Sequence, residues 1–132
     1  MNKSTTYCES LTKYHRRKSR VVHIGDIPLG GDYPIRIQSM TTTDTMDTQG
    51  TVEQSIRMIE AGCEYVRITA PSIKEAQNLA EIKKELRKQG YTTPIIADIH
   101  FTPNAALEAA QIVEKVRINP GNFGRQEEIP TN

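Results

Sequence analysis

Apolar and polar residues alternate in three short stretches of the chain. Residues 35–38 read Ile-Arg-Ile-Gln, residues 66–69 read Val-Arg-Ile-Thr, and residues 116–119 read Val-Arg-Ile-Asn. Alternation with a period of two is typical of β-strands, because successive side chains point to opposite faces of a sheet. In each stretch, the arginine and the polar residue two positions later are therefore expected on the same face.

Helices are predicted between these stretches. Apolar residues in 51–61 recur at the spacing of an amphipathic helix. The Ser-Ile-Lys-Glu sequence of residues 72–75 has the spacing of a capping box, which opens a second helix. Thr-Pro at residues 102–103 suits the first positions of a third helix. Strands and helices therefore alternate, with the strands expected at residues 34–39, 65–69, 94–99 and 113–119.

The remaining predicted element is a β-hairpin over residues 19–29, before the first of these strands. Gly25 and Asp26 lie between its two apolar halves, and both residue types tolerate the backbone conformations of tight turns. We expect this hairpin to cover the open bottom of a larger sheet.

The order of elements predicts an α/β fold with parallel strands. In an open doubly wound sheet, helices cover both faces, so the strands should be apolar throughout. Arginines on one face instead favour a (β/α)₈ TIM barrel, whose interior that face would line. A complete barrel needs about 250 residues, and the chain has 132. We therefore expect a partial barrel of about the first four strand–helix units, with open edges on the first and fourth strands.

Composition and charge narrow the class of protein. The formal net charge is +1, which gives no bulk electrostatic reason to bind nucleic acid. No run approaches the roughly 20 apolar residues of a membrane span, and the start of the chain lacks the apolar segment of a secretory signal. A cytoplasmic protein is therefore expected. Residues 1–18 are expected to form a solvated basic arm, and residues 19–132 the N-terminal half of the barrel.

The two cysteines, Cys8 and Cys63, lie far apart in the sequence and form no CxxC pair. They predict neither a metal site nor a disulfide framework.

The carboxyl ends of the predicted strands carry the candidate binding residues. Arginine on an inner face is costly to bury unless an anion or a carboxylate meets it. Its planar guanidinium suits phosphate or carboxylate oxygens, and active sites of TIM barrels lie at these strand ends. No catalytic residue is assigned. The candidate substrate-binding residues are Arg36, Gln38, Arg67, Asp98, His100, Arg117, Asn119 and Asn122.

Two structural alternatives remain open. An inward arginine can pair with an aspartate in a purely structural network. Asp44 and Asp47 have a spacing that could hold Mg²⁺ on a diphosphate, but capping of the following helix or simple solvation is the favoured interpretation.

Several segments resemble one enzyme family, the 4-hydroxy-3-methylbut-2-enyl diphosphate synthases of the non-mevalonate isoprenoid pathway. The resemblance lies in Ala-Asp-Ile-His-Phe at residues 97–101 and Val-Arg-Ile-Asn-Pro-Gly-Asn at residues 116–122, supported by residues 37–41 and 60–67. The Met-Thr-Thr-Thr-Asp-Thr loop at residues 40–45 resembles the longer form found in some bacteria and in plastids.

The resemblance implies an oxidoreductase that opens the ring of 2-C-methyl-D-erythritol 2,4-cyclodiphosphate reductively, giving (E)-4-hydroxy-3-methylbut-2-enyl diphosphate. It implies a [4Fe-4S] cluster in a separate C-terminal domain, ferredoxin or flavodoxin as the electron donor, and a homodimer at full length. Cys8 and Cys63 do not correspond to the cluster ligands, so we expect this chain to be inactive alone. By motif, Arg67, Asp98, His100, Arg117 and Asn119 fall on the family's substrate-binding positions, with Asn122 nearby.

Two other functions compete with this one. A non-redox phosphate-binding barrel, such as an aldolase or a pterin-type synthase, would need a lysine or a general base at a strand end, and no strand-end lysine is present. A non-catalytic anion-binding module would need no further chemistry.

Overall fold

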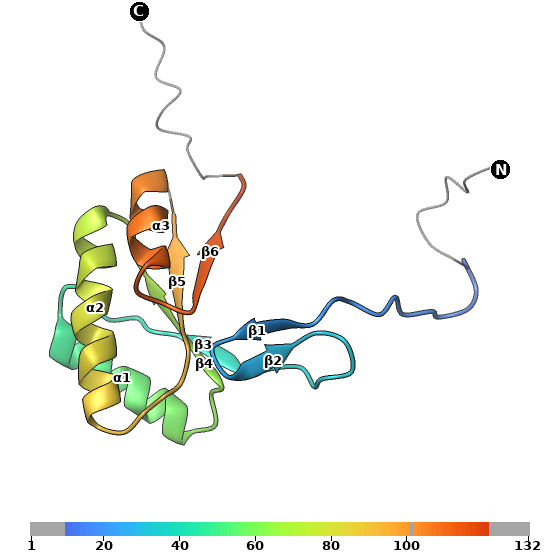
Figure 1. Cartoon of the computed structure of the whole chain (residues 1–132), viewed down its shortest axis with the longest axis horizontal. Coiled ribbons are helices and arrows are strands. Elements are labelled where there is room, and N and C mark those ends of the chain that lie inside the picture. Colours follow the sequence, from blue (N-terminus) through green and yellow to red (C-terminus); the bar gives the residue numbers. More distant parts are fainter. Residues whose placement is uncertain (1–9, 101, 122–132) are drawn as a thin grey trace, which may run out of the picture.

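The computed structural model describes residues 10–100 and 102–121 of the chain. Two short antiparallel strands come first, and parallel strands alternating with helices follow (Figure 1). The elements are β1 (Val22–Ile24), β2 (Ile27–Leu29), β3 (Gln38–Met40), α1 (Thr48–Glu60), β4 (Tyr65–Thr69), α2 (Ile73–Lys88), β5 (Ile95–Ile99), α3 (Pro103–Ala110) and β6 (Lys115–Ile118).

Strands β3 to β6 form one parallel sheet in sequence order, β3-β4-β5-β6. All three helices lie on one face of this sheet (Figure 1). The α/β prediction is therefore confirmed for the described residues. Strands β3 and β6 lie at the two edges of this sheet, as expected for its first and fourth strands.

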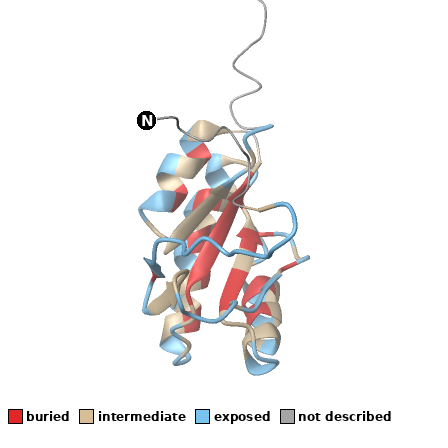
Figure 2. Ribbon diagram, turned by 90° about the vertical axis from the view of Figure 1, so that its right-hand side faces the viewer, coloured by how far each residue is buried: buried red, intermediate tan, exposed pale blue. Residues whose placement is uncertain are grey.

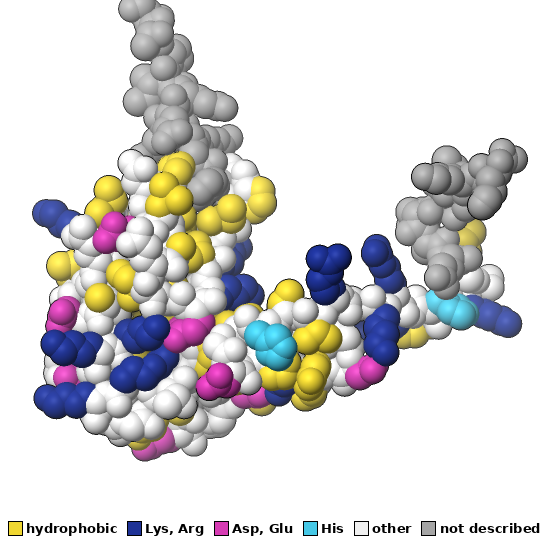
Figure 3. Space-filling view, in the orientation of Figure 1, with side chains coloured by type: hydrophobic (Ala, Val, Ile, Leu, Met, Phe, Trp, Pro, Cys, Tyr) yellow, Lys and Arg dark blue, Asp and Glu magenta, His cyan; other side chains and the backbone are white. Residues whose placement is uncertain are grey.

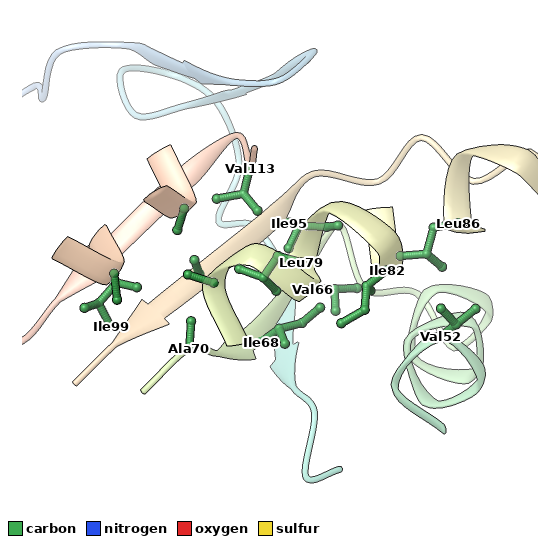
Figure 4. Packing of buried hydrophobic residues seen from close by; sticks show 14 residues of the cluster. Val52, Val66, Ile68, Ala70, Leu79, Ile82, Leu86, Ile95, Ile99 and Val113 are labelled. Atoms are coloured by element: carbon green, nitrogen blue, oxygen red, sulfur yellow. The ribbon is translucent and has the colours of Figure 1, made fainter. Parts of the chain in front are cut away.

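The main hydrophobic core lies between the sheet and the helices (Figure 4). Val66 and Ile68 of β4 are fully buried there, as are Leu79 and Ile82 of α2. Full burial of such a side chain contributes about 1.5–3 kcal/mol, so this layer is the main source of stability. The buried strands appear in red at the centre of the sheet in Figure 2.

A smaller core lies on the opposite face of the sheet, where the hairpin packs. A buried cluster there consists of Ile24 of β1, Tyr65 of β4 and Ile96 of β5. The Tyr65 hydroxyl donates a hydrogen bond of 3.2 Å to the backbone oxygen of Ile27, and burial raises the pKa of this phenol. The hairpin thus covers the amino ends of β4 and β5, which confirms the predicted hairpin and its position.

The first predicted strand is wrong in its bounds, because β3 begins only at Gln38. Ile35 is 91% exposed and Ile37 is 59% exposed, so neither packs beneath a helix as expected. The physical reason is the carboxylate of Glu64. It accepts hydrogen bonds from the Ile37 N–H (3.2 Å) and from Arg36 (2.9 Å), so a side chain binds the Ile37 N–H, while the Ile37 backbone oxygen still accepts from the N–H groups of Glu64 (2.7 Å) and Tyr65 (3.2 Å).

A side-chain cap closes the start of α1 but not the start of α2. Helix α1 begins at Thr48, three residues earlier than predicted, and the Asp47 carboxylate accepts a hydrogen bond of 3.0 Å from the Gly50 N–H. This confirms the capping interpretation of Asp47. Ser72 is the N-cap of α2, but its hydroxyl contacts the Glu75 carboxylate and makes no capping bond to the backbone.

The extended segment before β1 carries many basic residues. Figure 3 shows lysine and arginine side chains spread along it, away from the helices. Residues 11–20 are all exposed. In the part of the chain that the structure describes, no helix has the length and apolar character needed to cross a membrane.

Candidate functional site

Three charged side chains meet near the carboxyl ends of β4, β5 and β6. Asp98 of β5 lies between Arg67 of β4 and Arg117 of β6. One Asp98 oxygen lies 3.4 Å from Nε of Arg67, and the other accepts a hydrogen bond of 3.1 Å from Nη1 of Arg117. We call these residues the arginine–aspartate cluster.

Strand register brings the three residues together. Asp98 pairs with Arg117 across β5 and β6, and with Thr69 across β4 and β5. Arg67 precedes Thr69 by two positions, so it shares its face. On the same face, nearer the amino ends of β4 and β5, Tyr65 and Ile96 contact the hairpin. The residues of β4 and β5 that point to the other face contact the helices. The prediction that Arg67 and Arg117 share the face away from the helices is thus confirmed.

Burial differs strongly among the three residues. The Asp98 side chain is 3% exposed, whereas those of Arg67 and Arg117 are 29% and 41% exposed. Two guanidinium groups and one carboxylate leave one positive charge in excess. Each guanidinium has five N–H donors. Asp98 accepts a hydrogen bond from one nitrogen of Arg117, whereas it meets Arg67 only at ion-pair distance, because the buried Nε of Arg67 has no hydrogen-bond partner. The remaining donors and the excess charge suit an anion at the exposed side of the cluster.

Met40 supports Arg67 from the neighbouring strand. Nη2 of Arg67 lies 3.3 Å from the Met40 sulfur, and the Thr41 N–H donates a hydrogen bond of 2.9 Å to the Arg67 backbone oxygen. The sequence analysis missed Met40. Its spacing of two residues from Gln38 was a usable signal, because it places Met40 on the same face.

Two other predicted residues, His100 and Asn119, lie at this end of the sheet. His100 follows β5, two positions after Asp98, and is half-buried. The Asn119 side chain follows β6 and accepts a hydrogen bond of 3.0 Å from the Gly121 N–H, which holds the turn after the strand. Asn122 lies outside the described residues.

Arg36 and Gln38 do not join the cluster, although Gln38 shares its face as expected, because both residues lie toward the amino end of the sheet. Gln38 pairs with Tyr65, at the amino end of β4. Arg36 precedes β3, and its guanidinium donates to the Glu64 carboxylate (2.9 Å) and to the Pro28 backbone oxygen (2.9 Å). Arg36 therefore ties the hairpin to the sheet, at the end opposite the cluster.

A cavity of about 480 Å³ lies beside the cluster, between the loop after β3, the end of β4 and the first turn of α2. Its volume is within the range of small-molecule sites. Its lining residues are Met40, Thr41, Thr42, Thr43, Asp44, Thr45, Thr69, Pro71 and Glu75. Met40 thus contacts both Arg67 and the cavity.

The described residues do not fit an iron–sulfur cluster or another metal ion. No three histidine, cysteine, aspartate or glutamate side chains among them lie close enough to share a metal. Cys63 is a free, partly buried cysteine. We therefore derive no step of a reaction through a metal group held by this part of the chain.

Comparison with known proteins shows the family. The family model of the GcpE TIM-barrel domain matches residues 19–131. The chain belongs to this family. The match begins where the predicted hairpin begins, and it confirms the resemblance seen in the sequence.

Curated relatives of this GcpE-domain chain carry one enzyme name. "4-Hydroxy-3-methylbut-2-en-1-yl diphosphate synthase (flavodoxin)" from Parabacteroides distasonis is 66% identical over 110 residues, which is 83% of this chain and 18% of the relative. The same-named protein of Protochlamydia amoebophila is 53% identical over 117 residues, 89% of this chain and 18% of the relative. The chloroplastic, ferredoxin-named protein of Oryza sativa is 50% identical over 117 residues, 89% of this chain and 16% of the relative. The chain thus spans less than a fifth of each of these relatives.

Proposed function

We propose that this chain supplies part of the substrate site of a 4-hydroxy-3-methylbut-2-enyl diphosphate synthase. That enzyme is an oxidoreductase of isoprenoid biosynthesis, which opens the ring of 2-C-methyl-D-erythritol 2,4-cyclodiphosphate reductively. The observation that carries the proposal is the arginine–aspartate cluster, because its donors and excess positive charge match a diphosphate. The names of the relatives support the same activity.

In this proposal, the arginines bind the diphosphate and Asp98 orients them. Exposed N–H donors of Arg67 and Arg117 bind phosphate oxygens, while the buried Asp98 carboxylate holds both guanidinium groups in place. His100 and Asn119 lie at the ends of β5 and β6 and reach the same ligand. The family motif also places Asn122 near the ligand. No residue of this chain is assigned to the chemical step.

We also propose that β3 to β6 are the first four strands of a (β/α)₈ barrel. The family model is that of a TIM-barrel domain, and strand order, parallel pairing and helices on one face all agree with it. Residues 19–132 then form the N-terminal half of the barrel, and residues 1–18 form an arm.

In this proposal, the electron-transfer part of the activity is assigned to residues other than those that the structure describes. A [4Fe-4S] cluster held there would supply electrons, with flavodoxin or ferredoxin as its electron donor. The names of the relatives include flavodoxin or ferredoxin in parentheses, which supports one of these two proteins as the electron donor. A homodimer and a cytoplasmic location stay predictions of the sequence.

Nothing in the described site favours a Schiff-base aldolase. Lys115 is the first residue of β6 and lies at the amino end of the sheet, so the described strands β3 to β6 bear no lysine at their carboxyl ends.

Two substitutions test the proposal in the full-length enzyme that carries this segment. Arg67→Ala and Arg117→Ala each remove charged hydrogen bonds worth about 1.5–3 kcal/mol. We expect the cyclic diphosphate to bind about 10- to 100-fold more weakly, as measured by titration calorimetry.

Arg57→Ala is the matched control, because Arg57 is an exposed arginine in the last turn of α1 and is not part of the cluster. Its affinity should equal that of the wild type. Unchanged affinity in both Arg67→Ala and Arg117→Ala would refute the proposed site.

A further inference from the structure

The loop between β3 and α1 is held in place by side chains of two helices. From α1, the Gln54 side-chain oxygen accepts hydrogen bonds from the N–H groups of Thr42 (2.9 Å) and Thr43 (3.3 Å). The Gln54 side-chain nitrogen donates in turn to the Thr42 hydroxyl at 3.0 Å. This loop forms one wall of the cavity beside the arginine–aspartate cluster.

Asn78 of α2 fixes the same loop from the other side. Its amide nitrogen donates to the backbone oxygen of Thr45 (2.7 Å) and to the hydroxyl of Thr48 (2.9 Å). The Thr45 hydroxyl then donates to the backbone oxygen of Thr69 at 2.5 Å. A chain of hydrogen bonds therefore runs from α2 through the loop to the end of β4, two residues after Arg67. Asn78 itself is not among the residues that line the cavity.

These bonds make the cavity wall less polar than its threonines suggest. Three of the five lining threonines have hydroxyls bonded within the protein: that of Thr42 accepts from Gln54, that of Thr43 bonds to Thr51 at 2.8 Å, and that of Thr45 donates to the Thr69 backbone oxygen. What such side chains leave for a ligand is mainly their carbon surface. Among the described residues, the lining includes the acidic Asp44 and Glu75 and no basic residue.

The charges of the cavity and of the cluster are therefore opposite. A phosphate group inside the cavity would meet two carboxylates, whereas at the cluster it meets two arginines. A ligand that spans both places its anionic end on Arg67 and Arg117 and an uncharged end in the cavity. Met40, which touches both, marks the junction.

We propose that this cavity holds the uncharged carbon portion of an organic diphosphate, and that Asn78 is the positioning residue that keeps its wall in place. The proposal rests on the proposed function, because it takes the arginine–aspartate cluster as the site of the phosphates. It assigns the loop after β3 and helix α2 a role in recognising the organic part of the ligand.

The test compares two ligands in the full-length enzyme that carries this segment, the cyclic diphosphate and inorganic diphosphate. Inorganic diphosphate lacks the carbon portion, so it reports on the arginines alone. Asn78→Asp keeps the size of the side chain but replaces the donating amide. We expect this substitution to lower the affinity for the cyclic diphosphate about tenfold and to leave the affinity for inorganic diphosphate within about twofold of the wild type. A general loss of structure would lower both affinities.

The control is Gln77→Glu, the same amide-to-carboxylate change at the preceding, exposed position of α2. It should alter neither affinity. Asn78→Ala and Thr45→Val provide uncharged variants that break the same hydrogen-bond chain, so the test survives if Asn78→Asp does not fold.

The two proposals fail in different ways. If the Asn78 variants and Thr45→Val bind both ligands like the wild type, or lose both equally, the role of Asn78 and the cavity is refuted. If neither Arg67→Ala nor Arg117→Ala weakens the binding of either ligand, the proposed function itself is refuted.

Discussion

At the scale of single residues, the most informative side chain is Asp98. A carboxylate that is 3% exposed is costly to bury unless it is paired, and here two arginines from different strands pair with it. The sequence placed Asp98 and the two arginines on one face, but it left open whether they bind a ligand or each other. The structure shows that they bind each other and that the arginines keep an exposed side.

Removing the charge of Asp98 should destabilise the protein. Asp98→Asn keeps the shape but leaves two guanidinium groups close together without their shared carboxylate. We expect the free energy of unfolding to fall by about 1–3 kcal/mol, as measured by urea denaturation. The control is Asp32→Asn, because the pair of Asp32 with Lys18 is exposed and should contribute less than about 1 kcal/mol. Equal losses in the two variants would contradict the importance of the buried pair.

At the scale of elements, Glu114 joins α2, β5 and the start of β6. Its carboxylate accepts hydrogen bonds from the Ile95 N–H (2.9 Å) and Arg87 (2.8 Å), and it pairs with Lys83 at 3.2 Å. Burial alone would raise the pKa of Glu114, but the Ile95 N–H and Lys83 outweigh it and lower the pKa below its ordinary value. This junction lies at the amino ends of the strands, opposite the cluster.

The lowered pKa of Glu114 predicts a pH dependence of stability. Because the carboxylate binds protons less readily in the folded state, its contribution is present above the ordinary pKa of 4.5 and is lost as the pH falls through the lower, folded pKa. Glu114→Gln should therefore cost about 1–2 kcal/mol at pH 7, and the difference from the wild type should shrink in acid.

Urea denaturation at several pH values measures this effect, with Glu81→Gln as the control, because Glu81 is exposed on α2. A wild-type-to-Glu114→Gln difference that stays constant down to acid pH would show that the charge of Glu114 is not responsible.

At the scale of the whole molecule, the described sheet has two edges, and the chain spans a fifth or less of the relatives it matches. No metal-binding group is formed by the described residues. We predict that the 132-residue chain, expressed by itself, does not turn over the cyclic diphosphate. Anaerobic reconstitution with iron and sulfide should leave it without a [4Fe-4S] chromophore, whereas a full-length relative treated in parallel should gain one. A bound cluster chromophore in the isolated chain would overturn this prediction.

Local patterns predicted the elements well because their causes are local. The period-two alternation of β4 depends only on residues 65–69, and the capping spacing at residue 72 depends only on its neighbours. The prediction failed at residues 34–37, where the Glu64 carboxylate, 27 residues from Ile37 in the sequence, binds the Ile37 N–H in place of a strand partner. Alternation by itself could not reveal that competitor.

The sequence by itself determined the alternation of strands and helices, the shared face of Arg67 and Arg117, and the family. These follow from periodicity and motifs, which are properties of adjacent residues. Only the tertiary structure decided that Asp98 joins the two arginines, that Arg36 serves the opposite end of the sheet, and that Asn78 supports the cavity wall. Those contacts depend on strand register and helix packing, which bring together residues 19 to 33 positions apart in the chain.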